Sequence, residues 1–93
     1  MTTFLLPQEI TIYEVADIYA ELLAVISQSD SLELDGKAVE ELDTSGLQLL
    51  LWSRNECRKI DIQWKLTSPS DELSQCLELA GFELSDSDSG EAI

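Results

Sequence analysis

The feature that most constrains this chain is the strict alternation of apolar and polar residues in its extended segments. The clearest case is residues 60–67, whose apolar positions all fall on one face: Ile60, Ile62, Trp64 and Leu66. Residues 9–12 and residues 32–35 alternate in the same way. Strands buried on both faces read instead as continuous apolar runs. The sequence therefore predicts a sheet that helices cover mainly on one side.

Segments with helical spacing lie between and after these strands. Apolar residues recur at helical intervals in residues 15–26, and a second helix is predicted over residues 44–58. A third is predicted from Ser68, with Ser68 as its cap, Pro69 at its first position and Gly81 as its left-handed stop. Phe4 to Leu6 supply a further short strand. This alternation predicts an α/β fold.

The length of 93 residues suits one domain with a single modest core. We assign residues 1–83 to that domain. Residues 84–93 are acidic and rich in serine, without apolar periodicity, and are expected to form a flexible tail.

The formal net charge of -14 arises from 19 acidic against 5 basic residues. Such a charge disfavours nucleic acid and anionic membranes as partners and favours a protein with a basic surface. The alternative is that the acidity serves only solubility. No segment reaches the roughly 18 apolar residues of a membrane span, so no membrane insertion is expected and the cytoplasm is the expected compartment.

Catalysis is not expected from this composition. The chain has no His, and its four glycines are isolated, so neither the usual general base nor a phosphate-binding loop is present. No cofactor and no metal site are predicted. Cys57 and Cys76 are too few and too widely spaced for a redox pair, a metal cluster or a disulfide scaffold, and are interpreted as reduced core residues.

A hydroxyl pair behind an aspartate opens the second predicted helix. Asp43 is predicted to cap it, which places Thr44 and Ser45 in its first turn, followed by Gly46. Free backbone N–H groups and the helix dipole favour a phosphate at this position. This turn therefore offers a hydroxyl, on Thr44 or Ser45, that a kinase could phosphorylate. The alternative is that Asp43, Thr44 and Ser45 form only a good helix cap.

At about 100° per residue, this helix divides into two faces. One is predicted to point toward the sheet: Leu47, Leu50, Leu51 and Cys57. The opposite side carries Ser45, Leu49, Trp52 and Glu56. We interpret Gln48, Leu49 and Trp52 as partner-binding residues beside this hydroxyl-bearing turn. The alternative is that a neighbouring loop or helix covers Leu49 and Trp52.

The segment Asp43-Thr44-Ser45-Gly46-Leu47, between the strand at residues 32–35 and Gln48-Leu49-Leu50-Leu51, resembles the Asp-Ser-Ser/Thr-Gly-Leu signature of STAS domains, the bacterial anti-sigma factor antagonist family. The resemblance spans roughly Leu5 to Phe82. It implies a two-layer sandwich with a mixed sheet of about four to five strands and helices mainly on one face, in agreement with the strand patterns.

The resemblance also implies a function. In that family a partner kinase phosphorylates the hydroxyl residue after the aspartate, here Thr44, and the complex then dissociates. One expectation is therefore a phosphorylation-controlled antagonist that binds an anti-sigma or signalling kinase. The other is a STAS subunit that is not phosphorylated, in a chemotaxis-type signalling assembly or a lipid-transport ABC system.

Overall fold

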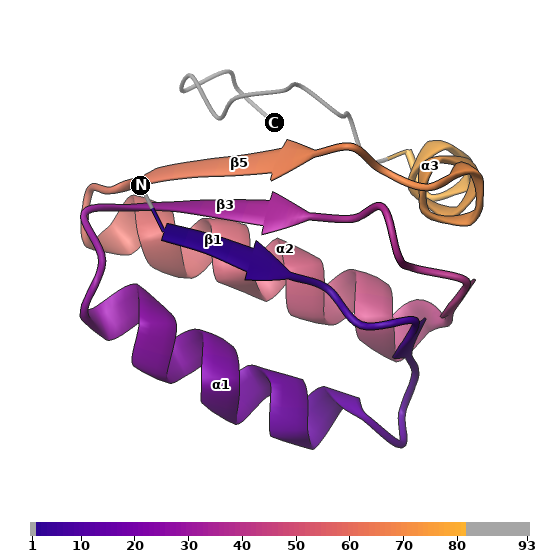
Figure 1. The fold of residues 1–93 in the computed structure, drawn as a ribbon, viewed down its shortest axis with the longest axis horizontal. Coiled ribbons are helices and arrows are strands. Elements are labelled where there is room, and N and C mark those ends of the chain that lie inside the picture. Colours follow the sequence, from indigo (N-terminus) through magenta and orange to yellow (C-terminus); the bar gives the residue numbers. More distant parts are fainter. Residues whose placement is uncertain (1, 82–93) are drawn as a thin grey trace.

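Three parallel strands form the main sheet of the protein, in the order β1 (Thr2–Leu5), β3 (Ser31–Asp35) and β5 (Gln63–Thr67). The computed structural model describes residues 2–81. Helices α1 (Val15–Ser27) and α2 (Thr44–Lys59) lie side by side along one face of this sheet, as Figure 1 shows. The sheet and these helices form the two layers of the fold.

Two short strands and a short helix lie at the end of the main sheet where its strands finish. A separate parallel pair joins β2 (Glu9–Ile10) to β4 (Glu41–Leu42). Helix α3 (Asp71–Leu79) lies beyond the carboxyl ends of β3 and β5 and contacts β4 (Figure 1). Every strand pairing within residues 2–81 is parallel, where a mixed sheet of four to five strands was predicted. The α/β class itself is confirmed.

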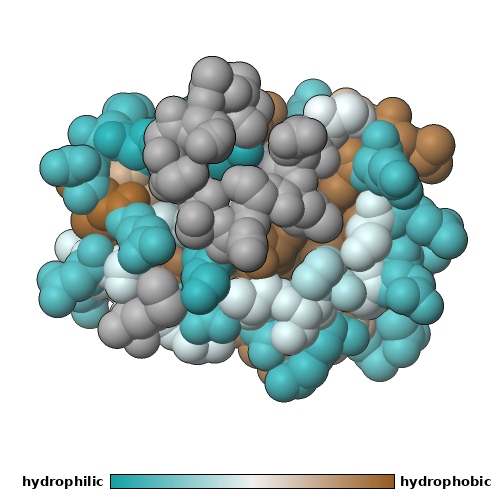
Figure 2. Space-filling view, turned by 90° about the horizontal axis from the view of Figure 1, so that it is seen from above, coloured by the Kyte–Doolittle hydropathy of each residue, from teal (hydrophilic) through white to brown (hydrophobic). Residues whose placement is uncertain are grey.

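The alternation read from the sequence is visible in the strands of the main sheet. Leu32 and Leu34 of β3, and Trp64 and Leu66 of β5, are buried and face the helices. The residues between them are polar and less buried. Figure 2 views the molecule from above the sheet and shows hydrophilic residues along most of the visible rim.

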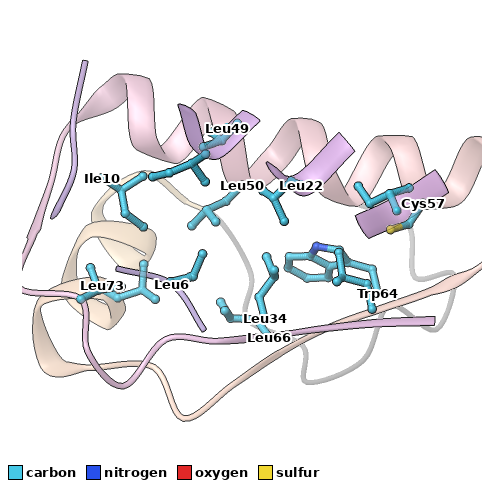
Figure 3. Packing of buried hydrophobic residues seen from close by; sticks show 14 of the residues in the cluster. Leu6, Ile10, Leu22, Leu34, Leu49, Leu50, Cys57, Trp64, Leu66 and Leu73 are labelled. Atoms are coloured by element: carbon cyan, nitrogen blue, oxygen red, sulfur yellow. The ribbon is translucent and has the colours of Figure 1, made fainter. Parts of the chain in front are cut away.

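The core lies between this sheet face and the two long helices. Figure 3 shows Leu22 of α1, Leu50 of α2 and Trp64 of β5 pointing into the same space. The Trp64 indole nitrogen donates a hydrogen bond of 3.0 Å to the Ser53 hydroxyl, which donates one of 2.7 Å to the Leu50 carbonyl. Because these buried polar groups are paired, the hydrogen bonds offset the cost of burying the Ser53 hydroxyl in the core.

Two predicted strands are shorter than expected. Ile12 does not continue β2: it lies in the turn before α1 and is 60% exposed. Ile60 does not begin β5 but caps the carboxyl end of α2, and Asp61 follows with a left-handed φ of 63°. The alternation of apolar and polar residues continues through both segments, but their backbones form tight turns. The pattern alone therefore predicts strands that are longer than those observed.

The start of the last helix also differs from the prediction. Ser70, not Ser68, is the N-cap of α3, and its hydroxyl accepts from the Leu73 backbone N–H at 3.1 Å. Ser68 has a left-handed φ of 49°, and Pro69 precedes the cap. Gly81 ends the helix with a φ of 74°, as predicted for the C-terminal stop. The predicted tail at residues 84–93 lies outside the described residues.

The predicted faces of α2 are rotated relative to the structure. Leu49, expected on the outer side, is only 6% exposed, whereas Leu51, expected to face the sheet, is 38% exposed. The reason is that α1 packs against the side of α2 that carries Leu49, so the buried arc of α2 includes both its sheet face and its α1 face. Arg54 is buried as well, with its guanidinium carbon 5.9 Å from the centre of the Trp64 ring.

Candidate functional site

Asp43 connects two parts of the chain at the amino end of α2. As N-cap, its carboxylate accepts one hydrogen bond from the Gly46 backbone N–H at 3.0 Å and another from the Ile12 N–H, also at 3.0 Å. The first bond satisfies a donor of the opening helical turn, and the second fixes the turn that leads into α1. The Asp43 side chain therefore links the start of α2 to the turn before α1.

Gly46 is required by close packing rather than by backbone conformation. It is buried where α2 approaches β2, and a Cβ atom there would overlap the carbonyl oxygen of Ile10. The same β2 carbonyl accepts the Asp43 backbone N–H at 3.5 Å. Only a residue without a side chain allows the helix to begin this close to the short strand.

A matching hydrogen-bonded turn precedes α1. Glu14 accepts from the Thr11 hydroxyl at 2.6 Å and from the Thr11 backbone N–H at 2.9 Å. These bonds, led by the hydroxyl, lower the pKa of the Glu14 carboxyl, while desolvation and the negative charge of Asp43 oppose the shift. Two carboxylates therefore hold the two helix starts in place.

Thr44 is the first residue of α2 and is exposed, whereas Ser45 is half-buried. Thr44 lies on the rim of an open groove of about 330 Å³ between the start of α2 and α3. The other residues that line this groove are Leu42, Asp43, Leu47, Cys76, Leu79 and Ala80. A protein that covered Thr44 would also meet this largely apolar groove.

Ser45 faces a second groove, of about 320 Å³, between α1 and α2. Helix α2 contributes Ser45, Gln48, Leu49 and Trp52, and helix α1 contributes Val15, Ala16 and Tyr19. Leu49 is too buried to project into a partner, whereas Trp52 is half-buried and packs against Tyr19 with ring centroids 4.5 Å apart. The three predicted partner-binding residues are thus together, but in a different groove from Thr44.

The residues around these grooves are strongly acidic. No Lys or Arg occurs in residues 1–36 or 38–53, nor after Lys65. The elements that form the two grooves are α1, β4, the first ten residues of α2, and α3, so none of them carries a base. Among the described residues, no group of three acidic or cysteine side chains is arranged to hold a metal ion. This end of the molecule therefore offers apolar surfaces for contact, surrounded by negative charge.

Sequence reasoning missed the contribution of α1 and α3 to the site. The apolar spacing over residues 15–26 predicts a helix, but not that Tyr19 is 43% exposed and lines the groove. A signal for this was present, because α1 has only three polar residues among its 13: Asp17, Glu21 and Ser27. A helix that covers one sheet face needs fewer apolar positions than this. No comparable signal marks the position of α3 beside Thr44.

Comparison with known proteins identifies the family to which this fold and turn belong. The STAS domain family matches residues 1–87, and the chain is a member of that family. No curated protein matches the chain. A solved structure, the crystal structure of a sulfate transporter family protein from Wolinella succinogenes, is similar with a TM-score of 0.71 and 25% sequence identity. The similarity covers 86% of this chain and 66% of that one, so this chain spans just under two thirds of its length.

The transporter named in that comparison raises the question of membrane insertion. Within residues 2–81, none of the helices combines the length and the apolar character needed to cross a membrane.

Proposed function

We propose that this STAS domain is a regulatory interaction module of the anti-sigma factor antagonist type, which binds a partner protein kinase and is released by phosphorylation of Thr44. The observation that carries the proposal is the placement of an exposed Thr44 as the first residue of α2, directly after the capping Asp43 and on the rim of a groove. A kinase can reach this hydroxyl without unfolding the helix. The protein itself has no catalytic role in this proposal and acts in the cytoplasm.

The direction of the switch follows from charge. A phosphate adds about 1.5 to 2 negative charges at neutral pH. The helix amino terminus favours it, but Glu40, Glu41 and Asp43 are close in sequence, and β4 and the first half of α2 provide no base to neutralise it. A partner that had closed over Thr44 would then bury an unmatched dianion, at a cost of several kcal/mol. Dissociation is the expected result.

The test is phosphorylation by candidate kinases encoded near the gene, followed by intact mass and site mapping. We expect one phosphate, on Thr44, and none on a Thr44→Ala variant that still binds the kinase. Ser45→Ala is the matched control, because it removes the neighbouring hydroxyl and should leave phosphorylation intact. Transfer to Ser45, or a Thr44→Glu variant that binds the kinase as tightly as the wild type, would contradict the proposal.

A second candidate is favoured by the similarity to a sulfate transporter family protein. In this case the chain is a STAS subunit of a transport or chemotaxis-type assembly and Thr44 is not phosphorylated. The protein purified from its own host would then have its unmodified mass, and Thr44→Ala would leave the assembly unchanged. The two candidates therefore differ in a measurement on the native protein.

A further inference from the structure

The groove between α1 and α2 is a separate surface from the one that carries Thr44. Ser45 and Gln48 point into it from α2, whereas Thr44 and Leu47 line the groove on the α3 side. The residues are adjacent in sequence, but successive positions of a helix face directions about 100° apart. A ligand in one groove therefore need not occupy the other.

The floor and walls of the α1–α2 groove are apolar and partly open. Leu49 forms the floor, and Tyr19 and Trp52, whose rings contact at an angle of 44°, close one side. Ala16 is exposed at its edge, and its short side chain leaves the groove accessible. Aromatic pairs in half-buried positions are typical anchor points of protein interfaces.

The apolar surface continues along α1 beyond the groove. Leu23 is 43% exposed one turn after Tyr19, and Ala20 between them is exposed too. The polar residues Asp17 and Glu21 occupy only one side of the helix. An apolar strip along two turns of helix matches an amphipathic helix laid into a groove, with apolar anchors spaced one turn apart.

The negative charge of the protein limits which partners could bind in the α1–α2 groove. Each copy of this chain carries a net charge of -14, so two copies repel one another, and an anionic membrane repels the protein as well. No base occurs in α1, whose exposed acids Asp17 and Glu21 would lie beside a bound helix. The surface is therefore complementary to an apolar helix face flanked by lysine or arginine.

We propose that the α1–α2 groove binds a basic amphipathic helix of a partner protein, with Tyr19 and Trp52 as the apolar contacts. This inference goes beyond the kinase interaction and does not depend on phosphorylation of Thr44. A phosphate on Thr44 is outside this groove and negative, so it does not weaken the binding of a basic helix. Phosphorylation is therefore expected to release the kinase without closing the α1–α2 groove to a basic helix.

The test uses the full chain and a fluorescent amphipathic peptide of leucine and lysine, compared with a peptide of the same composition whose order destroys the apolar face. We expect the amphipathic peptide to bind at least tenfold more tightly and to shift the backbone NMR signals of α1 and of residues 45–52. Ala16→Arg should weaken binding at least tenfold. Ala24→Arg, the same change at another exposed position of α1, should change it less than threefold.

Several outcomes would overturn the inference. These are equal loss in both arginine variants, equal binding of the two peptides, or NMR shifts confined to the α3 side of α2. Self-association of the chain that Ala16→Arg abolishes, or binding to anionic vesicles, would assign the groove to another occupant. Thr44→Glu separates this test from that of the proposed function: it should release the kinase but leave peptide binding unchanged or stronger.

Discussion

The two grooves beside the start of α2 share one helix but are built differently. The α2–α3 groove has an exposed hydroxyl residue, Thr44, on its rim and is bordered by a short helix of nine residues. The α1–α2 groove has a buried leucine as its floor and an aromatic pair as its wall. The first therefore suits a modification that changes charge, and the second suits steady apolar contact. Neighbouring residues of one signature turn can serve two different surfaces.

The largest expected effect tests the close packing at the amino end of α2, the helix that both grooves share. Gly46→Ala places a methyl group against the Ile10 carbonyl, and we expect it to destabilise the protein by more than about 3 kcal/mol, above the usual range for overpacking. Urea unfolding measures this. The control is Gly81→Ala, where no atom lies within 4 Å of the new methyl and the left-handed φ of 74° alone should cost about 1 kcal/mol. Equal effects would show that the β2 contact is not what requires Gly46.

A second variant tests whether the floor of the α1–α2 groove is structural. Leu49→Ala removes a buried side chain and should lower the free energy of unfolding by about 3 kcal/mol. Leu51→Ala, on the same helix but 38% exposed, should cost less than about 1 kcal/mol. If chemical denaturation showed Leu51→Ala to be more destabilising than Leu49→Ala, the buried face of α2 would be the one predicted from helical periodicity.

The connection between the two helix starts is tested at Asp43. Asp43→Ala removes the acceptor for both Gly46 and Ile12, and we expect a loss of about 2 kcal/mol. Ser70→Ala removes a cap with a single backbone bond, to Leu73, and should cost about 1 kcal/mol. Thermal unfolding of both variants gives the comparison. If Asp43→Ala costs no more than Ser70→Ala, the bond to Ile12 contributes nothing to stability.

The smallest effect is a pH dependence at the start of α1. The pKa of Glu14 is lowered from 4.5 by the Thr11 bonds, so its contribution to stability is present above pH 4.5 and is lost as the pH falls through the lowered value. We expect Glu14→Gln to be less stable than the wild type at pH 7, with the difference shrinking toward pH 3. The lowered pKa of Asp35, beside Lys37, affects both proteins equally and cancels. A stability difference between the two proteins that stayed constant from pH 7 to pH 3 would contradict a stabilising role of the ionised Glu14 carboxylate.

Much of the fold could be predicted because local chemistry fixes it. Alternation in β3 and β5, the apolar spacing of α1 and the Asp43 cap each depend on neighbours within a few residues, and each has its expected type of structure. Errors fell at element ends, such as Ile12, Ile60 and Ser68, where a tight turn competes with a pattern that continues past it. The family signature lies where the structure begins α2, with Asp43 as its cap.

The sequence by itself determined that a capped helix begins at Thr44 and that helices cover one sheet face, because capping and periodicity act over short distances along the chain. The tertiary structure alone decided which side of α2 is buried, since that depends on where α1 lies against it. It also decided that Thr44 and Trp52 face different grooves, because the walls of each groove come from segments distant in sequence. Contacts between distant segments are only weakly reflected in the local pattern of apolar and polar residues.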